Sequence, residues 1–482
     1  MTYTAQNVVE EKTQEALGLL NKDVVIKKGP TIGKRHQQAL ILCVLIHFCF
    51  IIRTALTVAI VAMNNPEASS NKDIPTFDWN DKSLIMASFL WGYCIPQIVA
   101  GYVSDKYGAK WFLVGTTTVT ATAGLLIPSA AIYFGSTGVM VCRFLQGISQ
   151  GFLFPSMHAV LGKWIPVPER SRLGTFVYSG SPLGIVSSLI LTGYICSTSY
   201  GWPMVFYLFN TIALIVVAIY AYIGSNDPRS HPTISEEEKN YIINSLNTAN
   251  DRHKLMVPWK DMLTSRAFIA LLITNMCFNF THWMFISETS IYLDKIMHFD
   301  LKSNSLLMSL PYIIEVFVGF TACFIADYLY AKNTISTSVI RKIMNNIGMF
   351  IPAVAIFLLT RTGANDKNYA ILCIILVSGC QGAGKSGHVV NHMDLAPNFS
   401  GVMMGITNRF AVVVSSFAPV LAQIIVKDEH NINQWRIIFY LTMGLNLFGV
   451  ISNTLFTSGK RQTWNEGKRR KEVSIETIKI KS

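Results

Sequence analysis

Residues 377–388 have the pattern of a phosphate-binding loop. They read VSGCQGAGKSGH, and Gly379, Gly384, Lys385 and Ser386 have the spacing of that motif. In such loops, backbone N–H groups and the lysine hold phosphate, and the loop joins a β-strand to an α-helix. Here the apolar run NYAILCIILVS precedes the pattern, and no alternation of strands and helices surrounds it. The context therefore argues against a nucleotide-binding enzyme.

We predict no nucleotide at the 379–386 pattern, and we expect its glycines to let helices pack closely and bend. Lys385 then needs another explanation. We expect its ammonium group to face a cavity as a positive charge for an anion; the alternatives are pairing with a buried Asp or Glu, or reaching the membrane interface. We include Lys385 and the nearby Asn391 among the candidate substrate-binding residues.

A second set of residues has the chemistry to bind an anion. Arg53 lies inside the apolar stretch CFIIRTALTVAIVAM, and Arg143, Gln146 and Gln150 follow one another at i, i+3 and i+7. This spacing puts the last three on one helix face. A guanidinium group with two amides beside it suits a carboxylate or phosphate. We predict that all four side chains contact the substrate.

The elements that carry these residues are membrane-spanning helices. Of the 482 residues, 51% are hydrophobic and only 14% are charged, whereas soluble domains carry about 25% charged residues. Stretches of about 20 apolar residues, the length that crosses a bilayer, recur along the chain. The predicted spans are 39–63, 83–104, 111–133, 138–161, 173–196, 203–224, 267–289, 306–330, 337–360, 369–391, 400–426 and 434–457.

A polar stretch divides these twelve spans into six plus six, so we predict an all-α membrane protein of two pseudo-symmetric six-helix bundles. Such repeat-built transporters place the substrate between the halves, near the bilayer midplane. The predicted segments are an N-terminal tail, a first bundle, a linker with a helix in TISEEEKNYIINSL, a second bundle and a basic tail: 1–38, 39–224, 225–266, 267–457 and 458–482.

The basic residues predict the orientation. With both ends in the cytoplasm, 28 of the 40 Lys and Arg residues fall in inner segments and 7 in outer loops, which is the expected excess on the cytoplasmic side. This distribution explains the net charge of +12, so no nucleic-acid partner is needed. The expected partners are the lipid bilayer and a small anionic substrate.

The loop after the second span, GYVSDKYGAK, contains Gly101, Asp105, Lys106, Gly108 and Lys110. This pattern resembles the signature of the major facilitator superfamily. Physically, the first glycine lets two helices touch, and the aspartate, by pairing with bases, holds a short inner loop as a latch that opens when the halves rock. The second half has a degenerate copy, CFIADYLYAK, which keeps an aspartate at Asp327.

Longer stretches are similar to the anion/cation symporter family, which includes sialin, the vesicular glutamate transporters and the type I sodium–phosphate cotransporters. They are residues 143–186, NDPRSHPTIS, FDLKSNSLLMSLPYI and residues 391–408. The sequence looks most like insect members named as inorganic phosphate cotransporters. The resemblance implies a secondary active transporter of small anions working by alternating access, with Arg53 and Arg143 binding the anion.

The resemblance leaves the coupling ion open. Sialin-like and glutamate-transporting relatives have a glutamate, implicated in proton coupling, where this chain has Gln150, an amide that cannot titrate. We hypothesise Na⁺ coupling, with H⁺ as the rival. Glu288, Glu315 and His392 are the coupling candidates, although a lone membrane histidine is more often structural.

Several alternatives remain open from the sequence. A proton-coupled lysosomal or vesicular exporter of acidic sugars or amino acids would fit the sorting pattern EALGLL, formed by Glu15, Leu19 and Leu20. The plasma membrane is the default location. An anion channel is the alternative of a different class. We expect no enzymatic activity, no organic cofactor and no metal site, and we expect a monomer.

Overall fold

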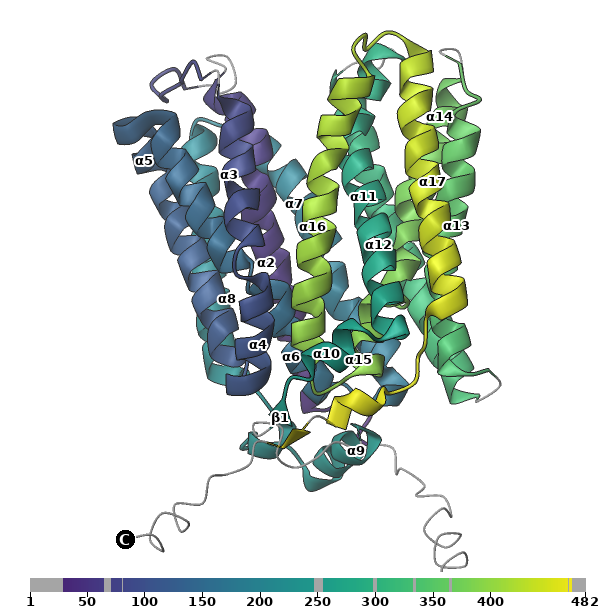
Figure 1. Cartoon of the computed structure of the whole chain (residues 1–482). Coiled ribbons are helices and arrows are strands. Elements are labelled where there is room, and N and C mark those ends of the chain that lie inside the picture. Colours follow the sequence, from purple (N-terminus) through teal and green to yellow (C-terminus); the bar gives the residue numbers. More distant parts are fainter. Residues whose placement is uncertain are drawn as a thin grey trace, which may run out of the picture.

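The structure is a computed structural model that describes residues 29–64, 71–79, 81–246, 255–297, 301–332, 335–363, 366–466 and 468–469. The sorting pattern at Glu15, Leu19 and Leu20 and the last part of the basic tail lie outside these residues. The described helices form two bundles side by side, and the space between them widens away from the linker (Figure 1).

The first bundle contains seven helical pieces in the described part of the chain. They are α2 Lys34–Met63, α3 Lys82–Cys94, α4 Gln97–Tyr107, α5 Lys110–Gln150, α6 Leu153–Trp164, α7 Arg170–Ser197 and α8 Gly201–Ile223. The predicted second span is bent by 42° between α3 and α4. Pro96 lies at this bend. The helix breaks there because proline has no N–H group to continue the helical hydrogen bonding.

Helix α5 is two antiparallel membrane passes joined by a tight turn. Gly135, with φ 60° and ψ −148°, breaks the helix in its middle, and glycine adopts this backbone conformation at no steric cost. The two passes lie against each other, since the Thr116 hydroxyl donates to the Ser149 carbonyl at 3.0 Å. The Thr120 and Ser149 hydroxyl groups are also 2.7 Å apart. The second pass ends at Gln150 and continues as α6.

The second bundle repeats this arrangement. Its helices are α11 Arg266–Lys295, α12 Leu301–Ala331, α13 Thr337–Leu359, α14 Lys367–Cys380, η4 Gln381–Lys385, α15 His388–Leu395, α16 Ser400–Ile425 and α17 Ile432–Phe456. The predicted tenth span, 369–391, is therefore broken: α14 ends at Cys380, a 3₁₀ turn follows, and α15 begins at His388. Its glycines pack against neighbouring backbone, as Gly382 does on α12.

Within the described residues, ten helices are long and apolar enough to cross a membrane, and the bent pair α3–α4 makes eleven. Counting the two passes of α5 separately adds one more, which matches the twelve predicted spans. The core of each bundle is apolar: Leu42, Trp164 and Tyr220 are buried in the first, and Tyr292, Ile356 and Trp435 in the second.

The linker and the chain's C-terminal part pack at one end of both bundles, here called the linker end (Figure 1). The remaining elements there are η1 Val167–Glu169, η2 Pro228–Ser230, α9 Glu236–Leu246, β1 Leu255–Met256, α10 Trp259–Leu263, η5 Thr463–Glu466 and β2 Lys468–Arg469. Strands β1 and β2 pair antiparallel, and α9 is the helix predicted in the linker.

The predicted boundaries need two corrections at this end. The first span begins at Lys34 rather than at residue 39, so the end of the predicted N-terminal tail is already helical. The predicted basic tail, 458–482, begins as packed structure, because the Asn398 side-chain amide donates to the Asn465 carbonyl at 3.0 Å and both residues are buried. Contacts of this kind produce no periodic pattern of apolar residues, so the sequence did not predict them.

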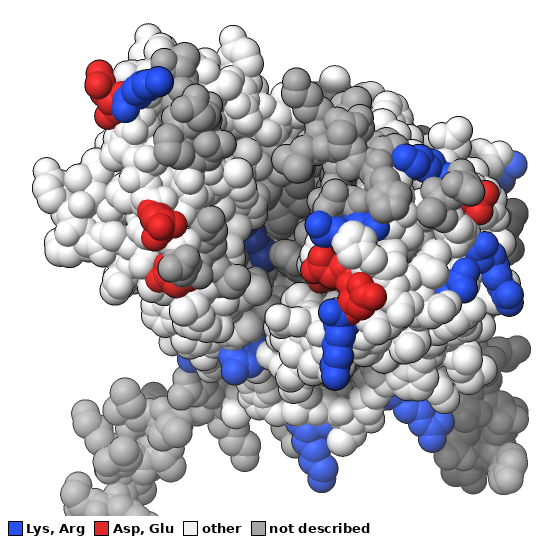
Figure 2. All heavy atoms as spheres, turned by 90° about the horizontal axis from the view of Figure 1, so that it is seen from above, with Lys and Arg blue, Asp and Glu red and all other residues white. Residues whose placement is uncertain are grey.

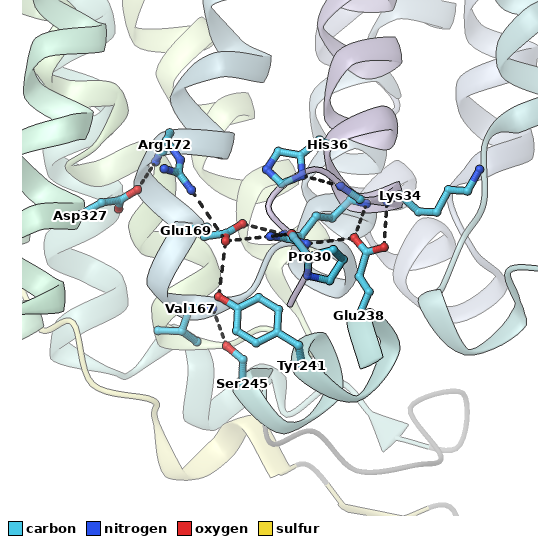
Figure 3. A network of polar contacts seen from close by, with 12 residues as sticks. Pro30, Lys34, His36, Val167, Glu169, Arg172, Glu238, Tyr241, Ser245 and Asp327 are labelled. Atoms are coloured by element: carbon cyan, nitrogen blue, oxygen red, sulfur yellow. Dashed lines mark hydrogen bonds and ion pairs between the residues drawn. The ribbon is translucent and has the colours of Figure 1, made fainter. Parts of the chain in front are cut away.

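A buried ionic cluster fastens linker helix α9 to the first bundle (Figure 3). The Arg35 guanidinium contacts Glu169 at 2.7 Å and Glu238 at 3.1 Å. Glu238 also accepts hydrogen bonds from the backbone N–H groups of Lys34 and Arg35, where a negative charge is favoured by the dipole of α2. Burial raises the pKa of Tyr241 to about 12, so its hydroxyl remains protonated as a donor to Glu169.

We predict that Arg35→Met destabilises the protein by about 3–5 kcal/mol, because it leaves Glu238 buried without its cation. The measurement is the thermal unfolding midpoint of the purified protein in detergent. Lys34→Met is the matched control, since the Lys34 ammonium contacts the Gln37 amide instead of a carboxylate. Equal midpoints for the two variants would contradict the role given to Arg35.

Candidate functional site

A central cavity of about 140 Å³ lies between the two bundles. Its walls come from α2, α3, α6 and α7 of the first bundle and from α11, α12, η4, α15 and α16 of the second. Seen from the end opposite the linker, the surface is hollowed between the bundles, and a basic side chain is visible deep inside (Figure 2). The cavity is smaller than the roughly 300–1,000 Å³ pockets that hold drug-sized ligands, so it suits a small solute.

Arg53 lines the cavity and is held by aromatic rings. Its guanidinium carbon lies 5.5 Å from the ring centre of Phe50, 4.8 Å from Phe89, 4.9 Å from Tyr93 and 5.4 Å from Trp283. Cation–π contacts of this kind stabilise a desolvated cation by about 2 kcal/mol or more. Among the described residues no carboxylate forms an ion pair with Arg53. Its charge therefore remains available to an anion.

The predicted polar face of the fourth span exists, but it contacts protein. Arg143 donates to the Arg53 carbonyl from both terminal nitrogens, at 3.3 Å, and to the Gln146 side-chain oxygen at 3.2 Å. Gln146 donates to the Thr120 carbonyl, and Gln150 donates to the Cys49 carbonyl. All three are buried and none of them lines the cavity. In this conformation Arg143 and Gln150 hold α2 close to Arg53 through hydrogen bonds to its backbone carbonyls.

Lys385 lines the cavity, as predicted, and it is also paired. Its ammonium nitrogen lies 3.0 Å from Oε1 of Glu315, and the two side chains are 10% and 7% exposed. The cavity-facing prediction and the alternative of pairing with a buried acid therefore both describe it. Glu315 lines the same cavity, so the pair is a single ionic unit facing the solute space.

Helix α11 has a polar face that was not predicted from the sequence. Asn275, Asn279 and His282 line the cavity, at i, i+4 and i+7, a spacing that places them on one helix face. Polar residues at that spacing within an apolar span are the sequence signal from which this polar face could have been predicted. From α16, Asn408 lines the cavity and donates to the Tyr93 hydroxyl at 2.9 Å, which fixes one ring around Arg53.

The remaining predicted residues lie away from the cavity lining. Asn391 is buried, and its side-chain atoms have no hydrogen-bond partner. His392 is fully buried and lies 2.8 Å from the Thr407 hydroxyl, with its ring 5.4 Å from that of His158; this is the structural role that a membrane histidine more often has. Glu288 is buried in α11, also outside the lining.

The signature loop closes the linker end. A Cβ atom on Gly101 would lie 2.4 Å from the carbonyl oxygen of Gly401, so only glycine lets α4 touch α16. Asp105 accepts a hydrogen bond from the Val402 backbone N–H at 2.8 Å, in the first turn of α16. Gly108 ends α4 with φ 90°, where other residues would be strained.

The two basic residues of the signature lie beside tyrosine and tryptophan rings. The Lys106 ammonium is 3.3 Å from the Tyr102 hydroxyl, and the Lys110 ammonium is 5.2 Å from the Trp111 ring centre. The hydrogen bond of Asp105 to the N-terminus of α16 joins the two bundles here.

The second half contributes an equivalent contact. Asp327 of α12 accepts hydrogen bonds from the N–H groups of Ser171 and Arg172, at 3.2 and 2.8 Å, in the first turn of α7. Figure 3 shows Asp327 beside Arg172. Each bundle therefore places an aspartate at a helix N-terminus of the other, where the helix dipole favours negative charge.

A buried ionic triad reinforces this closure. Asp394 accepts from Arg170 at 2.8 Å and from Arg341 at 2.5 Å. Arg170 belongs to the first bundle and the other two to the second, so the triad joins the bundles. All three are buried. The linker end is therefore closed, while the opposite end is hollowed (Figures 1 and 2).

Comparison with known proteins agrees with this arrangement. Residues 42–419 match the Major Facilitator Superfamily. The chain belongs to the major facilitator superfamily. It is 33% identical over 441 residues to the Drosophila melanogaster protein named "Putative inorganic phosphate cotransporter", covering 86% of this chain and 83% of that one.

Two human relatives extend the comparison. Sialin is 35% identical over 393 residues, covering 80% of this chain and 77% of sialin. Vesicular glutamate transporter 2 is 31% identical over 431 residues, with 86% and 73% covered. These relatives are transporters and not enzymes, and so is this member of the superfamily; it is an all-helical membrane transporter.

Solved structures of the superfamily have the same fold. The proton:xylose symporter XylE superposes with a TM-score of 0.65 at 14% identity, covering 89% of this chain and 97% of that one. The E. coli fucose transporter FucP in its outward conformation gives 0.61 at 12% identity, with 87% and 99% covered. In the superfamily fold, the cavity around Arg53 occupies the space between the two halves.

We predict that Gly101→Val disrupts closure of the linker end, because its side chain would collide with the backbone of Gly401. Overpacking of this kind costs about 1–3 kcal/mol, which should slow transport about tenfold or more. The readout is transport rate together with maleimide labelling of Ser400→Cys, a buried position, followed by mass spectrometry.

Gly115→Val is the matched control, because nothing lies within 4 Å of a Cβ atom at that position. The control should transport and label like the parent protein. If Gly101→Val leaves both transport and labelling unchanged, the closure contact between α4 and α16 does not limit the transport cycle.

Proposed function

We propose that this transporter moves small anions, inorganic phosphate or organic carboxylates, by alternating access coupled to Na⁺ or H⁺. The single observation that carries the proposal is Arg53, a guanidinium group that lines the central cavity without a carboxylate partner among the described residues. An arginine at the centre of a membrane helix costs about 2.5–3.5 kcal/mol on insertion scales. A binding role for its charge accounts for that cost.

The charges around the cavity support an anion over a cation. Arg53 and Lys385 are positive and Glu315 is negative, so the lining carries one net positive charge with its histidines neutral. Arg143 adds a second cation behind the wall, 4.8 Å from the same Phe89 ring that Arg53 contacts. The names of the relatives, which include phosphate and glutamate, point to the same class of solute.

Cation coupling follows from the energetics of import. Moving one negative charge inward against 100 mV costs about 2.3 kcal/mol, so an importer needs a cation to travel with the anion. An exporter from a vesicle or lysosome is the second candidate, supported by the similarity to sialin and a vesicular glutamate transporter.

We also propose the orientation and the location. The start of α2, the linker and strand β2 all lie at the linker end, where most of the basic residues are expected. This arrangement supports cytoplasmic placement of both chain ends, and the cavity then opens away from the cytoplasm. The plasma membrane is the proposed location, and fluorescence microscopy of the tagged protein, with and without Leu19 and Leu20, tests it.

We predict that purified protein in lipid vesicles takes up at least one of three labelled probes: inorganic phosphate, glutamate and glucuronate. An imposed Na⁺ or proton gradient should drive that probe above its external concentration. A passive anion channel would instead equilibrate it with the voltage and show no cation dependence, and no uptake of any probe would reject the proposed substrate classes.

We predict that Arg53→Met raises the KM for the transported probe about tenfold to a hundredfold, because a hydrogen bond to a charged group contributes about 1.5–3 kcal/mol. Arg53→Lys should be less affected, since it keeps the charge. Arg361→Met is the matched control: Arg361 also lies over an aromatic ring, 5.0 Å from the centre of Phe357, but is exposed outside the cavity. Identical kinetics for all three variants would remove Arg53 from the binding site.

A further inference from the structure

The ion pair between Lys385 and Glu315 faces the solute space. The ion pairs of Arg35, Arg170 and Arg341 lie at the linker end instead. The Lys385–Glu315 pair lines the central cavity, about one tenth exposed. It is therefore the contact that an entering anion meets.

The pair is also incompletely satisfied. Nζ of Lys385 lies 3.0 Å from Oε1 of Glu315, but neither Nζ nor Oε2 of Glu315 has a hydrogen-bond partner of good geometry. On the same side of the cavity, Nδ2 of Asn275 is buried and unpartnered as well. Buried polar atoms are rarely left without partners. Two donors and one acceptor on cavity-lining residues are thus left without hydrogen-bond partners.

A bound anion and the Glu315 carboxylate compete for one ammonium group. Both are negative, and two like charges sharing a buried site disfavour each other's ionised form. If the anion binds Lys385, the Glu315 carboxylate loses the cationic partner that the described residues give it, while it is still largely shielded from water. Burial of an unpaired carboxylate favours the protonated form. Arrival of the anion and uptake of a proton are then linked.

We propose that Glu315 is the proton-coupling residue of this transporter, and that its carboxylate occupies Lys385 until the transported anion displaces it. This inference rests on the proposed anion transport. On binding, the anion takes the Lys385 ammonium, and Glu315 takes one proton from a hydronium ion that enters the cavity, forming the O–H bond at Oε2 and leaving water. On release at the other end, the anion departs, Glu315 returns the proton to water, and the ion pair re-forms. One anion and one proton cross together.

The other titratable groups around the cavity are already engaged or carry fixed charge. His282 of α11 contacts the Gln381 side-chain oxygen at 2.9 Å, and His388 of α15 contacts that of Asn345 at 2.8 Å. Tyr178 of α7 contacts His158. Arg53 of α2 stays charged in proteins.

Among the elements packed against α12, helix α11 carries a further buried carboxylate, Glu288, which lies outside the cavity lining. Helices α13 and α14 contribute no charged side chain to the described lining, Arg341 of α13 is held by Asp394, and Glu169 of η1 is held by Arg35. On α12 itself, Asp327 binds the N-terminus of α7 at the linker end. Among the described residues, Glu315 is the carboxylate that lines the cavity, which favours protons over the sodium hypothesis drawn from the amides Gln146 and Gln150.

The test is Glu315→Gln in lipid vesicles, with phosphate, glutamate and glucuronate as probes. In the parent protein, one pH unit of gradient should concentrate the transported probe up to about tenfold without Na⁺. Glu315→Gln should lose this accumulation and its pH dependence but should still exchange labelled for unlabelled probe across the membrane, because exchange needs no proton release. Glu429→Gln, at an exposed loop position, is the matched control and should accumulate normally.

A second measurement covers the case in which Glu315→Gln folds poorly with Lys385 left unpaired. The double variant Lys385→Gln/Glu315→Gln removes both charges, and its folding is checked by size-exclusion chromatography. It should show no proton-driven accumulation. A pH indicator added to the detergent-solubilised parent protein should report proton uptake when the probe is added.

The outcomes separate the two proposals. Proton-driven accumulation that persists in Glu315→Gln or in the double variant would overturn the role of Glu315 while leaving anion transport intact. Accumulation by the parent that needs Na⁺ and ignores pH would overturn it as well. Absence of uptake of all three probes by the parent would instead reject the proposed function, and this inference with it.

Discussion

Charge inside a membrane protein must be compensated by the protein itself, and the described bundles place four intramembrane cations against aromatic rings, backbone carbonyls or a carboxylate. Arg53 lies among aromatic rings, Arg143 binds a backbone carbonyl, Lys385 faces Glu315, and Arg409 donates to the Cys94 and Ile95 carbonyls at the broken end of α3. Rings and carbonyls carry no formal charge, so they stabilise a cation without cancelling it. The charges of Arg53 and Arg143 are therefore not cancelled, whereas that of Lys385 is balanced by Glu315 as long as the ion pair is intact.

The same constraint governs how the two halves hold together. At the linker end, Asp105 and Asp327 each bind backbone N–H groups at a helix N-terminus of the opposite bundle. Such contacts with a helix dipole contribute about 0.3–2 kcal/mol each, so they close one end without locking it. The buried triad around Asp394 adds charge–charge contacts, but removing charges from water offsets much of their gain. The closure is thus compatible with repeated opening.

The sequence predicted the fold well because its signals are long. Twenty-residue apolar stretches, a polar linker and an excess of basic residues on one side do not depend on any single contact. The signature loop also gave a correct prediction at Gly101, which lies at the helix contact that its type suggested, whereas the hydrogen bond of Asp105 to the N-terminus of α16 was not predicted. The bend at Pro96 and the break after Cys380 are caused by a proline and by clustered glycines. These residues indicate in the sequence that a helix is interrupted, but not by what angle or over how many residues.

The site was predicted less completely, for physical reasons. Helical spacing placed Arg143, Gln146 and Gln150 on one face correctly, but spacing cannot tell a face that meets a cavity from one that meets another helix. The rings around Arg53 come from α2, α3 and α11, and the partner of Lys385 lies 70 residues away at Glu315. Such pairings exist only once the bundles are assembled.

The fourth membrane pass is interrupted in both bundles, between α5 and α6 in the first and between α14 and α15 in the second. The short segments below the two interruptions touch each other, through His158 and the Val389 carbonyl. Each is hinged to its longer upper segment by glycine. A local tilt of these two short segments would open the linker end while the longer segments stay packed in their bundles, before any rotation of the halves as wholes.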